Sequence, residues 1–153
     1  MWVEPAQLAH VPLIADNARQ ADVDEVAASH GHAIERALEL SIRLSLRAWL
    51  IGHREEPIGL FGVATSSVLS GRGSPWFLGT NAAERYPVAF LRASRDLLPE
   101  VTRGFRVLEN WVDERNTVSQ RWLGWLGFEL SEPQPWGREG RLFRHFQMRT
   151  NDV

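Results

Sequence analysis

One continuous stretch near the C-terminus, Val107 to Phe128, does most to restrict what this chain can fold into. Its sequence, VLENWVDERNTVSQRWLGWLGF, begins with residues that predict a strand over 106–112. Asn116 follows as a helix N-cap, because an Asn side chain can accept a hydrogen bond from a free N–H group of the first turn. The distance from Asn116 to Gly127 fits one amphipathic helix of about three turns, over Thr117 to Trp125. The stretch therefore predicts a strand, a helix and an exit into a further strand.

The rest of the chain divides into short apolar segments separated by turn residues, and we expect one domain over residues 1–153. Gly59 and Gly62 interrupt the third expected strand and indicate a bulge or a close backbone approach, while Ser70 to Pro75 predicts a loop. The other expected strands are Trp2–Pro5, Ala48–His53, Ile58–Ser66, Trp76–Gly79, Phe128–Leu130 and Arg141–Arg149. The other expected helices are Ala6–Gln20, Asp22–Ser29 with Asp22 and Glu25 as a capping box, Ile34 to about Arg43, and Ala83–Leu98 closed by Pro99.

The expected order of elements is β-α-α-β-β-β-α-β-α-β-β. This order, the V-x-x-x-N spacing of Val112 and Asn116, and the Gly127-Phe128 pair after the helix resemble the GNAT superfamily, the N-acetyltransferases that use acetyl-CoA. The resemblance implies an α/β (α+β) domain, with a mixed central sheet of about seven strands and about four helices. It covers essentially the whole chain, but only the motif from Val112 to Phe128 is specific.

A second resemblance is carried by three segments spread along the chain. The segments PAQLAHVPLIADNARQADVDEVAASHG, GSPWFLGT and LENWVDERNTVSQRWLGWLGF look like the internal virion protein A family of T7-like tailed phages. That family is described as GNAT-like and has no well-established activity. The resemblance implies partners among other phage or host proteins, and residence in the host cytoplasm or the virion. It leaves the formation of a homo-oligomer open.

Composition argues against several classes of function. The net charge of −2 argues against non-specific binding to nucleic acid or to an anionic membrane, since both need a basic surface. No apolar run reaches the length of a membrane span, and the N-terminus lacks the pattern of a signal peptide, so we expect a cytosolic protein. Without Cys there is no thiol nucleophile and no disulfide, and His30-Gly31-His32 predicts a surface turn rather than a metal site.

In GNAT enzymes a loop of type [QR]-x-x-G-x-[GA] follows the strand before the third helix and holds the CoA pyrophosphate through backbone N–H groups. Arg85 aligns with the start of this motif, but Val88 stands at the first Gly and Phe90 at the second small residue. Pro87 also removes one N–H donor. Two interpretations remain open, which are a CoA loop of unusual sequence and a plain capped helix N-terminus.

The resemblance also implies which residues would contact acetyl-CoA, the expected cofactor if any is bound. The expected strand Trp76–Gly79 would present backbone groups to the pantetheine arm, and further contacts would come from the motif loop and from the N-cap. These residues are Trp76, Phe77, Leu78, Gly79, Arg85 and Asn116.

Acid and base residues are the weakest part of the resemblance. The Tyr that usually protonates the CoA thiolate stands seven residues after the Asn, where this chain has Leu123, and Leu has no proton to donate. Glu109 is the candidate general base, since a buried carboxylate can have a raised pKa. A solvent-facing or ion-paired role for Glu109 is the alternative.

Three functions are therefore open at the level of sequence. The first is a GNAT-fold phage protein with a degenerate acetyl-CoA site and a virion-associated or protein-interaction role. The second is an active acetyl-CoA-dependent N-acetyltransferase acting on a small amine or a protein amine, with Glu109 as the base. The third is a module that binds a small molecule or an acyl group between the two central strands.

Overall fold

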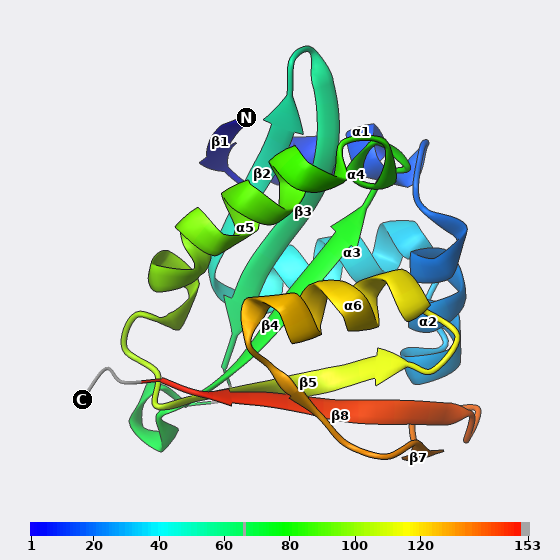
Figure 1. Cartoon of the computed structure of the whole chain (residues 1–153). Coiled ribbons are helices and arrows are strands. Elements are labelled where there is room, and N and C mark those ends of the chain that lie inside the picture. The colour runs from blue at the N-terminus through cyan, green and yellow to red at the C-terminus, as the bar shows by residue number, and fades with distance from the viewer. Residues whose placement is uncertain (66, 151–153) are drawn as a thin grey trace.

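Eight strands form one mixed, mostly antiparallel sheet that runs through the middle of the molecule (Figure 1). The computed structural model describes residues 1–65 and 67–150. Along the sheet the strands lie in the order β1-β2-β3-β4-β5-β8-β6, and β7 pairs separately with β8. Their bounds are β1 (Trp2–Pro5), β2 (Ser45–His53), β3 (Glu56–Ala64), β4 (Arg72–Gly79), β5 (Val107–Asp113), β6 (Glu129–Leu130), β7 (Gln134–Pro135) and β8 (Leu142–Arg149).

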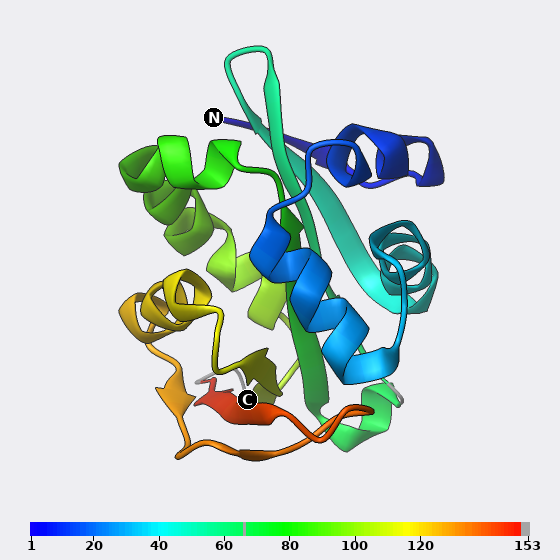
Figure 2. The same cartoon turned by 90° about the vertical axis from the view of Figure 1, so that its right-hand side faces the viewer.

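Helices cover both faces of the sheet, as Figure 2 shows from the side. The first three α-helices pack their apolar residues on one face of β2, β3 and β4, whereas α5 and α6 pack on the opposite face. Their bounds are α1 (Val11–Ala15), α2 (Gln20–His30), α3 (Ile34–Leu44), α4 (Ala82–Arg85), α5 (Pro87–Thr102) and α6 (Thr117–Leu126), with short 3-10 turns η1 (Leu8–His10) and η2 (Val68–Ser70). Within the described residues, no helix is both long enough and apolar enough to cross a membrane.

The two central strands, β4 and β5, stay together over a very short distance. They pair in parallel only through Arg72 with Val107 and Gly73 with Leu108. Beyond these pairs β4 continues beside β3, and β5 continues beside β8. Figure 1 shows the two strands diverging, which opens the sheet at its centre.

The N-terminal helices differ from the sequence expectation. In place of one helix over Ala6–Gln20 the chain forms η1 and α1. The helix ends at α1 because the next segment is extended and pairs with the end of β4. There Arg19 donates its backbone N–H to the Gly79 carbonyl over 2.8 Å. The helix expected from Asp22 already begins at Gln20, so Asp22 is not its N-cap. Tertiary contacts with β4 thus override the local capping pattern.

The middle of the chain also shows boundary differences. β4 includes Arg72 to Pro75 of the expected Ser70–Pro75 loop, because Ser74 and Pro75 pair with β3, and Arg72 and Gly73 pair with β5. The expected helix Ala83–Leu98 is divided into α4 and α5, since Pro87 cannot donate a helical hydrogen bond, and α5 continues through Pro99 to Thr102. The expected strand end at Ser66 lies outside the described residues.

The glycines of β3 confirm the predicted close backbone approach. A Cβ atom on Gly59 would lie 2.5 Å from the ring of Phe77, and one on Gly62 would lie 2.5 Å from the carbonyl oxygen of Arg47. Both contacts are shorter than van der Waals distance. Glycine is therefore needed here for side-chain and backbone packing within the sheet.

Candidate functional site

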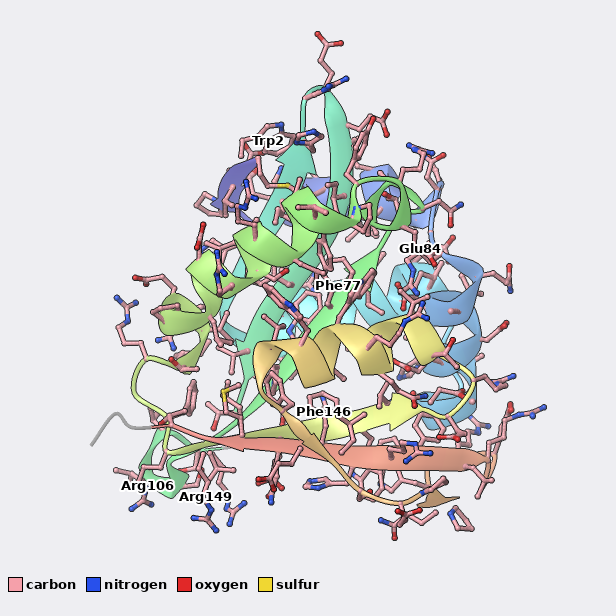
Figure 3. The ribbon with its side chains drawn as sticks, viewed as in Figure 1. Trp2, Phe77, Glu84, Arg106, Phe146 and Arg149 are labelled. Carbon is pink, nitrogen blue, oxygen red and sulfur yellow. The ribbon has the colours of Figure 1, made fainter. Side chains whose placement is uncertain are left out.

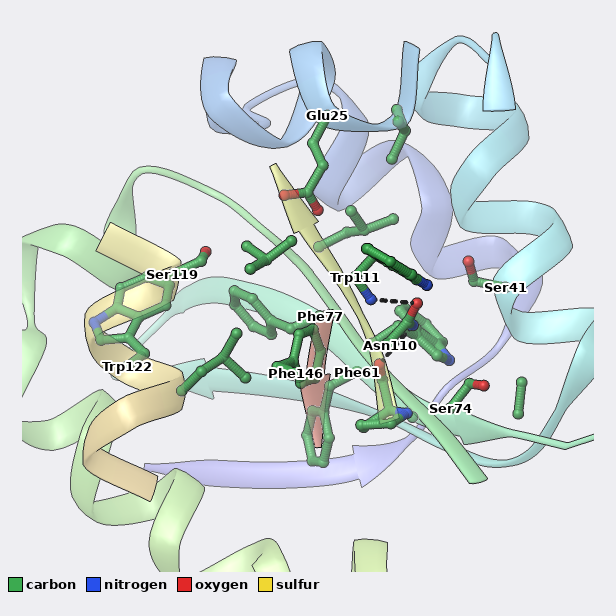
Figure 4. A pocket seen from close by; sticks show the side chains of 18 of the residues that line it. Glu25, Ser41, Phe61, Ser74, Phe77, Asn110, Trp111, Ser119, Trp122 and Phe146 are labelled. Carbon is green, nitrogen blue, oxygen red and sulfur yellow. Dashed lines mark hydrogen bonds between the residues drawn. The ribbon is translucent and has the colours of Figure 1, made fainter. Parts of the chain in front are cut away.

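A cavity of about 420 Å³ occupies the opening between β4 and β5. The cavity receives side chains from both helical layers, and most of its walls are aliphatic or aromatic (Figure 4). Asn110 bridges its two strands, because its side-chain amide donates to the carbonyl of Pro75 over 3.0 Å. The strand residues that line the cavity include Ser74, Pro75, Trp76, Phe77, Leu78, Asn110, Trp111 and Val112.

Glu25 of α2 brings a carboxylate into this cavity, as Figure 4 shows. Its Oε1 atom accepts hydrogen bonds from the backbone N–H of Asp113, at 2.8 Å, and from the side-chain amide of Asn116, at 3.3 Å. Burial, followed by the negative charge of Asp22, raises the pKa of Glu25 to about 7, and the two hydrogen bonds only partly oppose this shift. A carboxylate with this pKa can take up a proton near neutral pH.

A buried ionic network holds this end of α2 in place. The Arg19 guanidinium donates to Asp22 over 2.9 Å, to Asn116 over 3.2 Å and to Glu84 over 3.4 Å. Arg19 and Asp22 are both 1% exposed. The second Asp22 oxygen accepts from the backbone N–H of Gly79 over 2.9 Å. The network therefore connects α2 with the end of β4, with α4 and with the start of α6.

Asn116 confirms its predicted role as the N-cap of α6, because its side chain accepts from the backbone N–H of Ser119. The same side chain is nearly buried and contacts Arg19, Asp22 and Glu25. It therefore links the start of α6 to the carboxylate in the cavity. A further role in binding a cofactor stays a prediction.

Three aromatic rings fill the space between β4, α5 and α6. The ring centroid of Phe90 lies 5.0 Å from that of Phe77 and 4.4 Å from that of Trp122. Figure 3 places Phe77 between the two helices. Leu123, at the position where the GNAT resemblance expects Tyr, also lines the cavity and has no proton to donate.

The start of α5 offers few groups to a phosphate. Pro87 has no N–H, and the N–H of Phe90 already donates to the Tyr86 carbonyl, which leaves Val88 and Ala89 as donors in the first turn. Arg85 pairs with Glu56 at the surface. Of the other residues expected to contact CoA, Trp76, Phe77 and Leu78 line the cavity, whereas Gly79 contributes its backbone to the network around Asp22.

Glu109 lies elsewhere on β5. It forms an ion pair with Arg72 and faces His145 at 3.5 Å, and it is not among the described residues that line the cavity. This environment corresponds to the ion-paired alternative for Glu109. Its role as a base stays a prediction, for which Glu25 is better placed.

The sequence pattern did not indicate Glu25 as a base or Arg19 as part of the site. The residues Asp22 and Glu25 matched a local capping pattern, so their carboxylates were assigned to the helix start. One signal was available, since Asp22, Glu25 and Ser29 fall at helical spacing beside Val26 and must therefore face the same packed side. The position of Arg19 depends on contacts with α4 and α6, which no local pattern indicates.

Comparisons with known proteins agree with this architecture. No protein-family model and no curated protein matches the chain. The ribosomal-protein-alanine N-acetyltransferase from Brucella melitensis is similar in structure, with 18% identity, coverage of 98% of this chain and 100% of that chain, and a TM-score of 0.71. The protein yncA from Salmonella typhimurium, solved with its cofactor acetyl-CoA, has 17% identity, coverage of 99% and 95%, and a TM-score of 0.71.

RimL, a ribosomal L7/L12 alpha-N-protein acetyltransferase in complex with coenzyme A, is also similar, with 11% identity, coverage of 99% of this chain and 94% of that chain, and a TM-score of 0.69. The chain therefore has the GNAT acyl-CoA N-acyltransferase fold, as the order of its elements predicted. At these identities the likeness extends to the fold alone. The resemblance to the phage virion protein family receives no support from the comparisons and stays a prediction.

Proposed function

We propose that this chain is an acyl-CoA-dependent N-acyltransferase in which Glu25 is the general base. The observation that carries the proposal is a carboxylate with a pKa of about 7 on the wall of an apolar cavity, at the point where β4 and β5 separate. Acetyl-CoA is the cofactor in the similar structure of yncA. An apolar cavity of about 420 Å³ suits the acyl and pantetheine part of such a cofactor better than its phosphates.

Acetyl-CoA would supply an acyl group activated as a thioester. The cavity residues Trp76, Phe77 and Leu78 would lie along the neutral part of the cofactor. Glu25 would accept the proton of the acceptor amine on Oε2, because both of its hydrogen bonds within the described residues go to Oε1. The apolar walls would lower the local dielectric around the carboxylate and so strengthen its interaction with the amine.

The test measures acetyl-CoA consumption with a panel of primary amines, using the whole chain. We expect Glu25→Gln to lower turnover by about 10²–10³-fold, because Gln keeps an acceptor for Asp113 N–H but cannot take a proton. Glu109→Gln is the matched control, and we expect it to retain turnover. A Glu25→Gln variant that remains as active as the original chain would overturn the assignment of the base.

A second function is favoured by the start of α5. Val88 and Phe90 stand at small-residue positions of the CoA loop, and Pro87 removes a donor, which favours a scaffold whose phosphate site is degenerate. Under this reading its partners would be phage or host proteins, in the cytoplasm or the virion. Calorimetry with acetyl-CoA separates the two functions. A micromolar dissociation constant contradicts the scaffold, and the absence of binding at millimolar acetyl-CoA contradicts the transferase.

A further inference from the structure

Four aromatic side chains gather on the cavity wall next to α2, and we call this group the vestibule. The indole rings of Trp111 and Trp136 stack with centroids 4.9 Å apart and planes 10° from parallel. The ring of His30 meets Trp136 edge-on at 5.9 Å and stacks on His32 at 6.1 Å. All four residues line the same cavity as Glu25. No step of the acyl transfer described above uses them.

The loop after β7 fixes the position of the vestibule residue Trp136 against α2. The loop after β7 joins the C-terminal end of α2, because Arg138 and Glu139 donate their backbone N–H groups to the carbonyls of Ser29 and Ala28, at 2.9 and 3.1 Å. Gly137 makes this contact with a φ of +80°, and a Cβ atom there would lie 2.9 Å from the Ser29 backbone. Trp136 is thus held against α2, and its position is set by two segments distant in sequence.

The charges on the cavity wall have one sign. Glu25 is the only acidic residue among the described residues that line the cavity, and neither Arg nor Lys is among them. Arg138, which belongs to the adjoining loop, covers Gly31 and is not a lining residue. Burial, and then the proximity of His32, lowers the pKa of His30, so this imidazole is neutral above neutral pH. A lone carboxylate in a cavity that is also lined by indole rings is complementary to a cation.

We infer that the vestibule is the acceptor site of the enzyme and that it binds a small cationic amine, with its ammonium group between the outer surface of the indole stack and the Glu25 carboxylate. This inference rests on the proposed function, because the bound ammonium loses its proton to Glu25 before its nitrogen attacks the thioester carbonyl. Attack forms the amide bond and breaks the carbon–sulfur bond. The nitrogen loses two protons in all. Glu25 passes the first to solvent, and the second, lost after the attack, reaches the departing sulfur through water, so one proton is released for each amide formed.

The test measures binding of 2-phenylethylamine by calorimetry at pH 8, without acetyl-CoA, and compares it with the neutral isostere 2-phenylethanol. At this pH the amine is protonated and Glu25 is mostly ionised. We expect the amine to bind about tenfold or more tightly than the alcohol. Trp136→Ala should remove this preference, whereas Trp136→Phe, which keeps a π face, should retain most of it.

Trp125→Ala is the matched control, because Trp125 is a half-exposed indole on α6 and is not among the described residues that line the cavity. Thermal unfolding monitored by circular dichroism confirms that each variant is folded. Equal binding of the amine and the alcohol, or a Trp136→Ala variant that binds the amine as tightly as the original chain, overturns the inference. If acetyl-CoA binds while the amine preference is absent, only the vestibule assignment fails. If the amine preference depends on Trp136 while acetyl-CoA does not bind, the transferase fails and the vestibule is an amine-binding site without acyl transfer.

Discussion

The Glu25 carboxylate accepts a hydrogen bond from the backbone N–H of Asp113 over 2.8 Å, although 88 residues separate the two in sequence. Asp113 is the last residue of β5, the strand whose divergence from β4 opens the cavity. The contact therefore joins the helix that supplies the carboxylate to the strand that forms the cavity. It also engages Oε1, so that among the residues the structure describes Oε2 is the atom that remains for a ligand.

The pKa of Glu25 predicts a change in activity with pH. The base form increases as pH rises through about 7, so we expect kcat/KM to rise up to that pH and then to level off. The measurement is kcat/KM for acetyl-CoA at a series of pH values, with the amine held in excess. A profile with no inflection between pH 6 and 8 would contradict the role of Glu25.

The same group predicts a change in stability with pH. Between the ordinary pKa of 4.5 and the raised value of about 7, the folded state binds a proton that the unfolded state has lost. Stability must therefore fall as pH rises through this window, by at most about 3 kcal/mol. We expect Glu25→Gln to remove this loss, so that the variant unfolds at a higher temperature than the original chain at pH 8. A variant of lower stability at pH 8 would show that ionised Glu25 does not destabilise the fold.

Loss of Arg19 should be strongly destabilising. Arg19→Met leaves Asp22 buried without its positive partner, which costs about 3–5 kcal/mol, and urea unfolding measures the difference. Arg43→Met is the control, since Arg43 pairs with Glu39 on the exposed side of α3 and such pairs contribute about 0.5 kcal/mol or less. Equal effects of the two substitutions would contradict the role assigned to the buried network.

The start of α5 predicts how much of a cofactor the chain recognises. Because Pro87 supplies no N–H and Arg85 is already paired with Glu56, the phosphates of acetyl-CoA should add little affinity. We expect S-acetylpantetheine, which lacks the nucleotide, to bind within about tenfold of acetyl-CoA in calorimetry. A preference for acetyl-CoA of more than about 1,000-fold would reveal a working phosphate site.

Two glycines form a matched test of packing. Gly59→Ala places a Cβ atom 2.5 Å from the Phe77 ring, and we expect a loss of about 1–3 kcal/mol as the aromatic rings move. Gly124→Ala lies within α6, where nothing is within 4 Å of the new atom, so it should stabilise the chain by up to about 1 kcal/mol. Thermal unfolding of both variants distinguishes local crowding from a general effect of alanine.

Sequence patterns predicted those parts of the fold that depend on neighbouring residues. The stretch from Val107 to Phe128 forms a strand, an Asn-capped helix and a further strand, with Gly127 in the left-handed conformation after α6. The order of the strands and the main helices followed from the same kind of local signal. Boundaries were wrong where distant segments pair, as at the segment before Arg19, which joins the end of β4.

The candidate site shows the limit of that reasoning. Trp76, Phe77 and Leu78 were expected near the cofactor and do line the cavity, but the carboxylate was assigned to Glu109. The structure pairs Glu109 with Arg72 and directs Glu25 into the cavity. Helical spacing indicates only that Glu25 faces the packed side of its helix, whereas the cavity it enters and the Arg72 partner of Glu109 depend on which strands lie side by side.

By itself the sequence determined the kinds of elements, their order and the cap at Asn116, because hydrogen bonds within a turn and the periodicity of apolar residues act over a few positions. Only the tertiary structure decided that β4 and β5 separate after two paired residues. It also decided that Glu25 is desolvated at that opening. Both outcomes come from contacts between segments far apart in sequence, and such contacts set burial, charge and the pKa of a carboxylate.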